Sequence, residues 1–211
     1  MNPLVIALTK GRLQKKTVEL FEKAGFDCAV FSDPGRKLVL EMPDAGAKVV
    51  LAKAADVVTY VDHGVCDIGV VGKDTILEAG RSLYEVMDLG FGKCRFALAV
   101  KEGEDFFAPG KYRRRVASKY PAVAARYFLE QRMDVEIIKI EGSVELAPLL
   151  GLADGIVDLV ETGQTLRENG LVIARDILPV SARMVVNLAS MKMRKQEILN
   201  LLDRLKGAME G

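Results

Sequence analysis

The residues best suited to chemistry lie where an apolar stretch, residues 155–160, gives way to polar side chains and a glycine. Gly163 permits a tight turn and a close approach to a ligand. Donors at the start of a following helical segment favour an anion. We expect a phosphate to bind at this segment, here called the 162–165 loop, which consists of Thr162, Gly163, Gln164 and Thr165.

Two carboxylates, Asp158 and Glu161, lie on the same segment but suit a different chemistry. An ionised carboxylate only accepts hydrogen bonds, so it repels a phosphate and suits ribose hydroxyls or a phosphate-bound metal ion. The whole segment therefore predicts a ligand with both a phosphate and a ribose. An ordinary strand-to-helix connection with a threonine cap is the alternative interpretation.

A second candidate anion site follows the first apolar run of the chain. Lys10, Gly11 and Arg12 come directly after residues 4–8 and open a helical pattern. They lie at the carboxyl end of a strand, where open α/β sheets bind ligands. Arginine can hold a phosphate through two hydrogen bonds, whereas lysine acts as a point charge. Phosphate contact is therefore predicted here, with a solvated turn as the alternative.

Two further candidate contacts lie at strand-to-helix connections. Ser118 and Lys119 precede a helical pattern that begins with proline, and they suit a second phosphate group. Asp74 follows a strand that contains Gly69 and Gly72. That segment is not a P-loop, because only two residues separate its glycines and Asp74 stands where the motif requires Ser or Thr. We expect Asp74 to contact a ligand near a cleft between two lobes.

Apolar runs alternate with helical patterns, which indicates an α/β architecture with mostly parallel sheets. A stripe of apolar residues in the last helix predicts docking on a lobe rather than a coiled coil. We place the crossing between two lobes at Phe91, between two glycines. The expected strands cover residues 4–8, 49–51, 68–71, 96–100, 115–117, 136–140 and 156–160, and the expected helices cover 13–24, 55–61, 122–131 and 191–209.

Composition indicates a globular chain without a broad surface for polyanions. Its 211 residues are 50% hydrophobic, enough for a sizeable core, and 30 basic against 29 acidic residues leave a net charge of +1. This balance does not favour binding to nucleic acid or an anionic membrane. The basic run at residues 111–115 is therefore interpreted as a solvated surface.

The cysteines, the histidine and the amino terminus exclude other classes. Three widely spaced cysteines predict buried thiols rather than disulfides or zinc ligands. His63 is the only histidine, and no catalytic role is expected for it. The amino terminus has no basic leader, and its apolar run is too short for export or for spanning a bilayer. We therefore expect a cytoplasmic protein.

Longer motifs resemble one known family over nearly the whole chain. Residues 142–148 (GSVELAP), 151–166 (GLADGIVDLVETGQTL) and 169–171 (NGL) resemble the pattern of ATP phosphoribosyltransferase. Residues 9–13 (TKGRL), 67–74 (DIGVVGKD) and 90–95 (GFGKCR) fit the same family in the right order. Two positions depart from the pattern, with Val58 in place of a usual proline and Ser118 in place of a usual threonine.

The resemblance implies transfer of the phosphoribosyl group of phosphoribosyl pyrophosphate to N1 of the ATP adenine, with pyrophosphate released and Mg²⁺ present. This is the first step of histidine biosynthesis. The resemblance also implies an α/β, two-lobed fold like that of type 2 periplasmic binding proteins, with an active-site cleft between the lobes. Residues 1–90 with 177–211 would form lobe I, and residues 91–176 would form lobe II, which carries the 162–165 loop.

The resemblance extends to a partner. Long members of the family carry an additional regulatory domain at the carboxyl end, whereas this chain stops at Gly211 and resembles the short form. Short forms work with a separate regulatory subunit similar to histidyl-tRNA synthetase. We therefore expect a hetero-oligomer.

Different motif residues are expected to contact different parts of the substrates. The 162–165 loop is expected to bind the 5-phosphate. Displacement at the anomeric carbon develops positive charge on the ribose, so Asp158 and Glu161 are expected to hold the ribose hydroxyls and act in catalysis. Lys10, Arg12 and Lys119 are candidates for pyrophosphate or the ATP phosphates, and Mg²⁺ is expected mainly on the substrate phosphates.

Two functions from other classes are alternatives. A base-salvage phosphoribosyltransferase usually carries two adjacent acidic residues ahead of a Thr-Gly-x-Thr loop, whereas two residues separate Asp158 and Glu161 here. A two-lobed protein that only binds a small molecule would share the fold without catalysis. The expected absence of an export signal and the loop around Glu161 count against it.

Overall fold

The protein divides into two compact units. The computed structural model describes residues 2–33, 35–110 and 113–210. Unit 1 comprises residues 1–92 with 181–211, and unit 2 comprises residues 93–180. These boundaries differ by a few residues from the lobes expected above, whose assignment stays a prediction. None of the helices in the described ranges has the length and apolar character that a membrane crossing requires.

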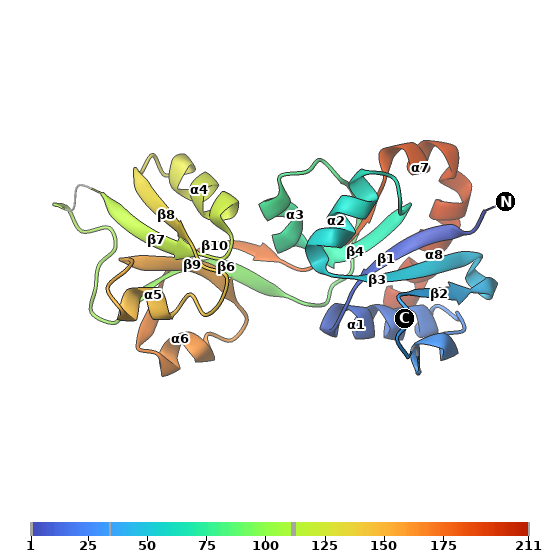
Figure 1. Cartoon of the computed structure of the whole chain (residues 1–211), viewed down its shortest axis with the longest axis horizontal. Coiled ribbons are helices and arrows are strands. Elements are labelled where there is room, and N and C mark those ends of the chain that lie inside the picture. Colours follow the sequence, from blue (N-terminus) through green and yellow to red (C-terminus); the bar gives the residue numbers. More distant parts are fainter. Residues whose placement is uncertain (1, 34, 111–112, 211) are drawn as a thin grey trace. The chain divides into compact units, whose positions relative to one another are not determined.

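Unit 1 is a six-stranded sheet with helices on both faces (Figure 1). The strand order is β2-β3-β1-β4-β11-β5. The strands are β1 (Leu4–Thr9), β2 (Val39–Met42), β3 (Ala47–Ala52), β4 (Ile68–Gly72), β5 (Tyr84–Asp88) and β11 (Ala182–Val186). The helices are α1 (Arg12–Lys23), α2 (Ala54–Asp62), α3 (Lys73–Ala79), α7 (Leu188–Met193) and α8 (Lys195–Glu210), with short 3-10 turns at η1 (Ala29–Phe31) and η2 (Pro43–Ala45).

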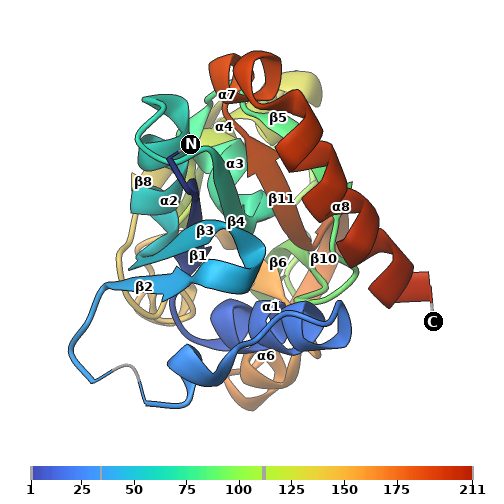
Figure 2. The same cartoon turned by 90° about the vertical axis from the view of Figure 1, so that its right-hand side faces the viewer.

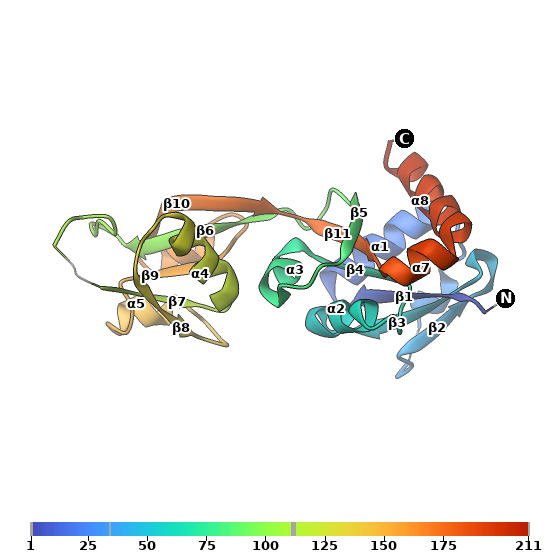
Figure 3. The ribbon, with the colours of Figure 1, turned by 90° about the horizontal axis from the view of Figure 1, so that it is seen from above.

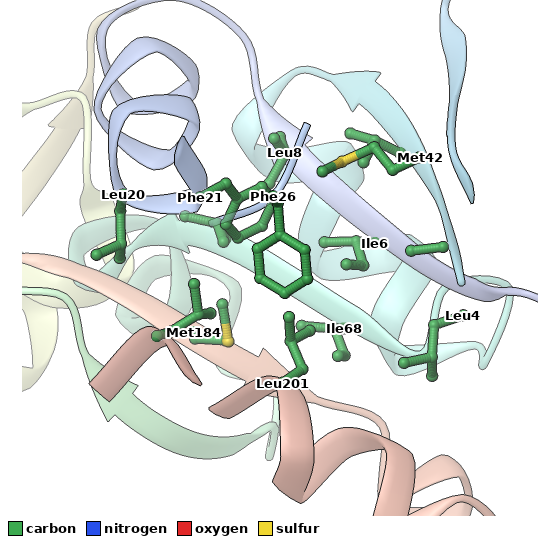
Figure 4. Packing of buried hydrophobic residues seen from close by; sticks show 14 of the residues in the cluster. Leu4, Ile6, Leu8, Leu20, Phe21, Phe26, Met42, Ile68, Met184 and Leu201 are labelled. Atoms are coloured by element: carbon green, nitrogen blue, oxygen red, sulfur yellow. The ribbon is translucent and has the colours of Figure 1, made fainter. Parts of the chain in front are cut away.

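The alternation of side chains along β1 decides which helices cover which face of this sheet. Successive residues of a strand point to opposite faces. Ile6 and Leu8 therefore face the core beneath α1 and α8, whereas Ala7 packs in the cluster formed with α2 and α3. Figures 2 and 3 show α1 and α8 on one side of the sheet and α2 on the other. In Figure 4, Phe21 and Leu201 project from the two helices toward Ile6. Burying each such side chain contributes roughly 1.5–3 kcal/mol.

The carboxyl-terminal helix differs from its expected bounds. The apolar stripe is confirmed, since Ile198, Leu201, Leu202 and Leu205 are all buried. The helical segment is nevertheless interrupted at Arg194, between α7 and α8. Its guanidinium donates to the carbonyls of Asn2 and Pro3 and pairs with Asp67 and Glu197. The break lets one arginine tie the start of α8 to the amino-terminal strand.

Unit 2 is a five-stranded sheet in the order β10-β6-β9-β7-β8. Figure 1 shows α4 on one face of it and α5 and α6 on the other. The core between this sheet and helices α5 and α6 includes Ala97 and Ile156 of the strands and Leu166 of α6. The elements are β6 (Cys94–Lys101), β7 (Arg114–Ser118), α4 (Pro121–Glu130), β8 (Val135–Lys139), α5 (Leu146–Leu149), β9 (Gly155–Val160), α6 (Gln164–Glu168) and β10 (Leu171–Val180).

The α/β architecture is as expected, but the prediction of mostly parallel sheets is wrong. Among the described strands, four pairings are parallel and five are antiparallel. The alternation of strands and helices identifies parallel strands joined by helical crossovers. Four of the five antiparallel pairings involve β2, β5, β10 or β11, which that pattern did not predict. Both sheets are therefore mixed.

The basic run at residues 111–115 is not uniformly solvated as expected. Lys111 and Tyr112 lie outside the described residues. Arg114 is only 6% exposed, with its guanidinium 5.1 Å from the centre of the Phe106 ring and a hydrogen bond donated to the Ala108 carbonyl. Its charge is accommodated by a carbonyl and an aromatic face, which composition alone does not indicate.

Candidate functional site

A cavity of about 280 Å³ opens in unit 2 at the end of β9 and the start of α6. It is lined by Glu145 and by the continuous segment 158–166. The structure therefore brings Asp158, Glu161 and the whole 162–165 loop to one cavity. Figure 1 shows where β9 and α6 lie in this unit.

Gly163 determines the shape of the loop. Its φ of 74° lies in the left-handed region, which side chains with a Cβ rarely adopt. It is the N-cap of α6 and brings no capping side chain. The first N–H groups of a helix have no acceptor within the helix, so they can meet an anion. Because α6 has only five residues, individual N–H groups matter here more than a long helix dipole.

Two polar side chains of the loop already make hydrogen bonds within the chain. The hydroxyl of Thr162 accepts the N–H of Gln164 at 3.3 Å. The amide of Gln164 donates to Glu168 at 2.7 Å, so this side chain is directed along the helix. Thr162, Gln164 and Thr165 are exposed. The threonine hydroxyls, which can still donate, are therefore better placed for a ligand than the Gln164 amide that the sequence suggested.

Burial raises the pKa of Asp158 to about 6, from an ordinary value of 3.8. The negative charge of Glu145 raises it further, while the N–H of Leu159 and the charge of Lys119 oppose the shift. Glu145 is a cavity residue that the sequence reasoning did not select. It lies within the motif at 142–148, but no spacing rule identifies a single glutamate before a short apolar helix.

Ser118 and Lys119, which precede α4, differ in their exposure and in how they relate to the cavity. Lys119 is exposed, and its charge acts on Asp158. Ser118 is fully buried, and its hydroxyl donates to the Val157 carbonyl at 2.6 Å and accepts the Tyr120 N–H at 2.9 Å. The Ser118 hydroxyl therefore joins β7 to β9 and shapes the turn that presents Lys119. Its direct contact with a phosphate stays a prediction.

The other predicted residues lie in unit 1, at the carboxyl ends of two adjacent parallel strands, β1 and β4. Gly11, with φ 96°, is the N-cap of α1 and has no side-chain cap. Lys10 and Arg12 on either side of it are exposed. Asp74 lies in the first turn of α3, and its carboxylate folds back over Gly72, where any Cβ would collide with it. These residues meet at one edge of the sheet, the edge at which α/β sheets bind ligands.

The cysteines and the histidine do not contribute to the cavity. Burial raises the pKa of both the Cys28 and Cys66 thiols to about 11, which keeps them protonated and unreactive at neutral pH. His63 is exposed at the end of α2. Within the described ranges, no three His, Cys, Asp or Glu side chains are grouped so that they could hold a metal ion.

Known proteins resemble the chain over its whole length. A family profile described as ATP phosphoribosyltransferase matches residues 53–207. An ATP phosphoribosyltransferase from Clostridium kluyveri is 58% identical over 201 residues, which cover 95% of this chain and 91% of that protein. One from Listeria monocytogenes is 54% identical over 211 residues, covering 100% and 98% of the two chains.

Solved structures also resemble it. The ATP phosphoribosyl transferase (HisG:HisZ) complex from Thermotoga maritima contains a chain that is 34% identical, with a TM-score of 0.84 and 98% of both chains covered. The periplasmic aliphatic sulphonate binding protein SsuA from Escherichia coli is only 13% identical, with a TM-score of 0.58 over 99% of this chain and 73% of that chain. The second likeness concerns the fold alone.

The raised pKa of Asp158 predicts a pH-dependent stability. A carboxyl with a folded-state pKa near 6 and an unfolded value near 3.8 stabilises the fold fully below about pH 4, and this contribution is lost as the pH rises through 6. Asp158→Asn should therefore be more stable than the wild type at pH 7.5, by roughly 3 kcal/mol. The advantage should shrink toward pH 4.

Urea unfolding between pH 4 and 8 measures this difference, with the exposed Asp134→Asn in the same unit as the matched control. A difference between Asp158→Asn and wild type that does not change with pH would contradict the assignment of the raised pKa.

Proposed function

The chain belongs to the ATP phosphoribosyltransferase family, and from that premise we propose that the cavity in unit 2 binds the ribose 5-phosphate part of phosphoribosyl pyrophosphate. The observation that carries the proposal is a single cavity lined by a glycine-centred loop, two threonines and three carboxylates. A ligand with one phosphate and one ribose matches both kinds of lining.

The reaction and the fold follow from the family. The chain transfers the phosphoribosyl group of phosphoribosyl pyrophosphate to N1 of the ATP adenine, giving phosphoribosyl-ATP and pyrophosphate, the first step of histidine biosynthesis. It is a pentosyltransferase with the two-lobed type 2 fold of periplasmic binding proteins. The alternatives of base salvage and of binding without catalysis are thereby set aside.

The 162–165 loop binds the 5-phosphate in this proposal. The N–H groups at the start of α6 and the hydroxyls of Thr162 and Thr165 supply donors. Gly163 supports the assignment, since its left-handed φ and missing side chain let the phosphate approach the backbone. Each hydrogen bond to a charged oxygen contributes about 1.5–3 kcal/mol.

Asp158 and Glu161 hold the ribose hydroxyls. Carboxylates near the ring favour the positive charge that develops at the anomeric carbon as pyrophosphate departs. Asp158, with a pKa of about 6, is mostly ionised at neutral pH and so accepts hydrogen bonds. Adenine N1 already carries a lone pair, so the attack requires no general base. Glu145 joins the two as a third carboxylate of the same cavity.

Pyrophosphate and the ATP phosphates are assigned to the remaining cations. Lys119 lies near Asp158, and Lys10 and Arg12 flank the uncapped start of α1. Gly11 keeps that helix end open to an anion in the same way as Gly163 does for α6. Asp74 completes this group of candidate ligand contacts.

Magnesium fits the carboxylates that are present. Mg²⁺ retains several waters and binds substrate phosphates with one or two carboxylates rather than an all-protein cage. Asp158 and Glu161 supply that small number of oxygen donors. The ion would be held mainly by the pyrophosphate group and would neutralise the charge that the leaving group gains.

We also propose a regulatory partner and a cellular location. The solved Thermotoga maritima relative is a HisG:HisZ complex, which supports a hetero-oligomer of this chain with a regulatory subunit similar to histidyl-tRNA synthetase. A biosynthetic enzyme that consumes ATP and phosphoribosyl pyrophosphate is placed in the cytoplasm, where these metabolites are made.

Thr165→Val tests the phosphate assignment. Loss of a hydrogen bond to a charged group should weaken phosphoribosyl pyrophosphate binding by about tenfold or more. Gly163→Val should be worse, because valine is strained at a φ of 74° and its Cβ would lie 3.2 Å from the Arg167 guanidinium. Isothermal titration measures both, with Thr59→Val on α2 as the control. Unchanged affinity in folded Thr165→Val would remove the assignment.

Glu161→Gln tests the role at the ribose. The change keeps the shape of the side chain and removes its charge. If Glu161 favours the transition state, turnover should fall more than the KM for phosphoribosyl pyrophosphate rises. Steady-state kinetics should show no comparable loss in Glu141→Gln, an exposed control in the same unit. A rise in KM with unchanged turnover would make Glu161 a simple binding residue.

Histidine titrations test the partnership. An effector acts only through a site whose occupancy differs between active and inactive states. If that site requires the second subunit, the pure chain should respond little to histidine, and adding the subunit should raise turnover and confer inhibition together. Strong inhibition of the pure chain would place the effector site within these 211 residues.

A further inference from the structure

Arg167, in the last turn of α6, reaches back over the 162–165 loop. Its Nη1 donates to the carbonyl of Thr162 at 3.1 Å. The same nitrogen lies 3.2 Å from the position that a Cβ on Gly163 would take. Arg167 is not among the described residues that line the cavity, although every residue from 158 to 166 is. The guanidinium therefore contacts a loop that lines the cavity without lining the cavity itself.

This contact fixes one peptide plane of the loop. In a trans peptide the C=O and N–H groups point in opposite directions. With the Thr162 carbonyl held by Arg167, the N–H of Gly163 points away from the guanidinium, and Gly163 itself lines the cavity. A rotation of this plane would exchange the two groups and present the partial negative charge of the carbonyl to a bound phosphate.

Gly163 makes that rotation accessible. Rotating the plane moves φ of Gly163 from 74° into the negative range, and glycine populates both signs of φ about equally. The residue that allows the N–H to face the cavity thus also allows it to turn away. A second contact must select between the two orientations of the peptide. Arg167 provides such a contact, because it donates a hydrogen bond to the Thr162 carbonyl.

We propose that Arg167 is a positioning residue that holds the Thr162–Gly163 peptide with its N–H toward the 5-phosphate of phosphoribosyl pyrophosphate. The inference rests on the proposed function of the 162–165 loop and adds a residue that does not itself touch the substrate. Arginine suits the task because its guanidinium stays charged and donates from a rigid, planar fork.

The test compares Arg167→Met with Arg126→Met, which removes the same charge from an exposed position on α4. Arg167→Met should raise the KM for phosphoribosyl pyrophosphate about tenfold, with little change in the KM for ATP or in Tm. Arg126→Met should stay within about twofold of the wild type. The tenfold effect should persist at about 0.5 M NaCl, where the attraction between distant charges is screened.

Three results would overturn the proposal. These are an unchanged KM for phosphoribosyl pyrophosphate, an effect that disappears at high salt and so belongs to charge alone, and a fall in Tm with equal losses for both substrates. The Thr165→Val variant shows whether a negative result concerns only Arg167 or also the proposal that the 162–165 loop binds the phosphate. If Thr165→Val weakens phosphoribosyl pyrophosphate binding and Arg167→Met does not, only the role of Arg167 is lost.

Discussion

The position of β9 within the sheet of unit 2 is the constraint on which the site depends. β9 pairs with β6 on one side and runs parallel to β7 on the other. A strand held on both sides is buried, so the Asp158 carboxyl is desolvated and its pKa rises. Because the carboxyl ends of parallel neighbours meet at one edge, the turn after β7 brings Lys119 near Asp158. β9 ends at Val160, where its pairing with Arg95 of β6 ends, and the 162–165 loop follows.

Charge decides how a ligand must lie in this cavity. Two unit charges 4 Å apart interact by about 4 kcal/mol at an effective dielectric constant of 20. Repulsion of that size exceeds the roughly 1.5–3 kcal/mol of one hydrogen bond to a charged group. This difference supports the proposed binding mode, with the phosphate at the N–H groups that open α6 and the ribose at the carboxylates. In the proposed binding mode, the pyrophosphate group needs Lys119 or Mg²⁺ to offset the same repulsion.

The sequence could predict the parts of this structure that local rules determine. A glycine between an apolar strand and hydroxyl side chains has few other uses, so the loop at 162–165 was predictable, as was the buried stripe on α8. Hydrogen bonds between residues far apart in the sequence could not be predicted, because they depend on the tertiary structure. The sequence did not indicate that the Ser118 hydroxyl joins β7 to β9, and its contact with a phosphate stays a prediction. Glu145, Arg114 and the antiparallel strand β10, whose exposed and partly buried residues follow no simple alternation, left no local signal.

The most direct test of the central claim is an amide NMR titration of the ¹⁵N-labelled chain with ribose 5-phosphate. We predict that the largest shifts fall on the N–H groups of Gly163, Gln164 and Thr165, because the proposal places these groups against the phosphate. Lys10, Gly11 and Arg12 should change little, since ribose 5-phosphate carries no pyrophosphate. Large shifts at residues 10–12 with an unchanged 162–165 loop would contradict the account.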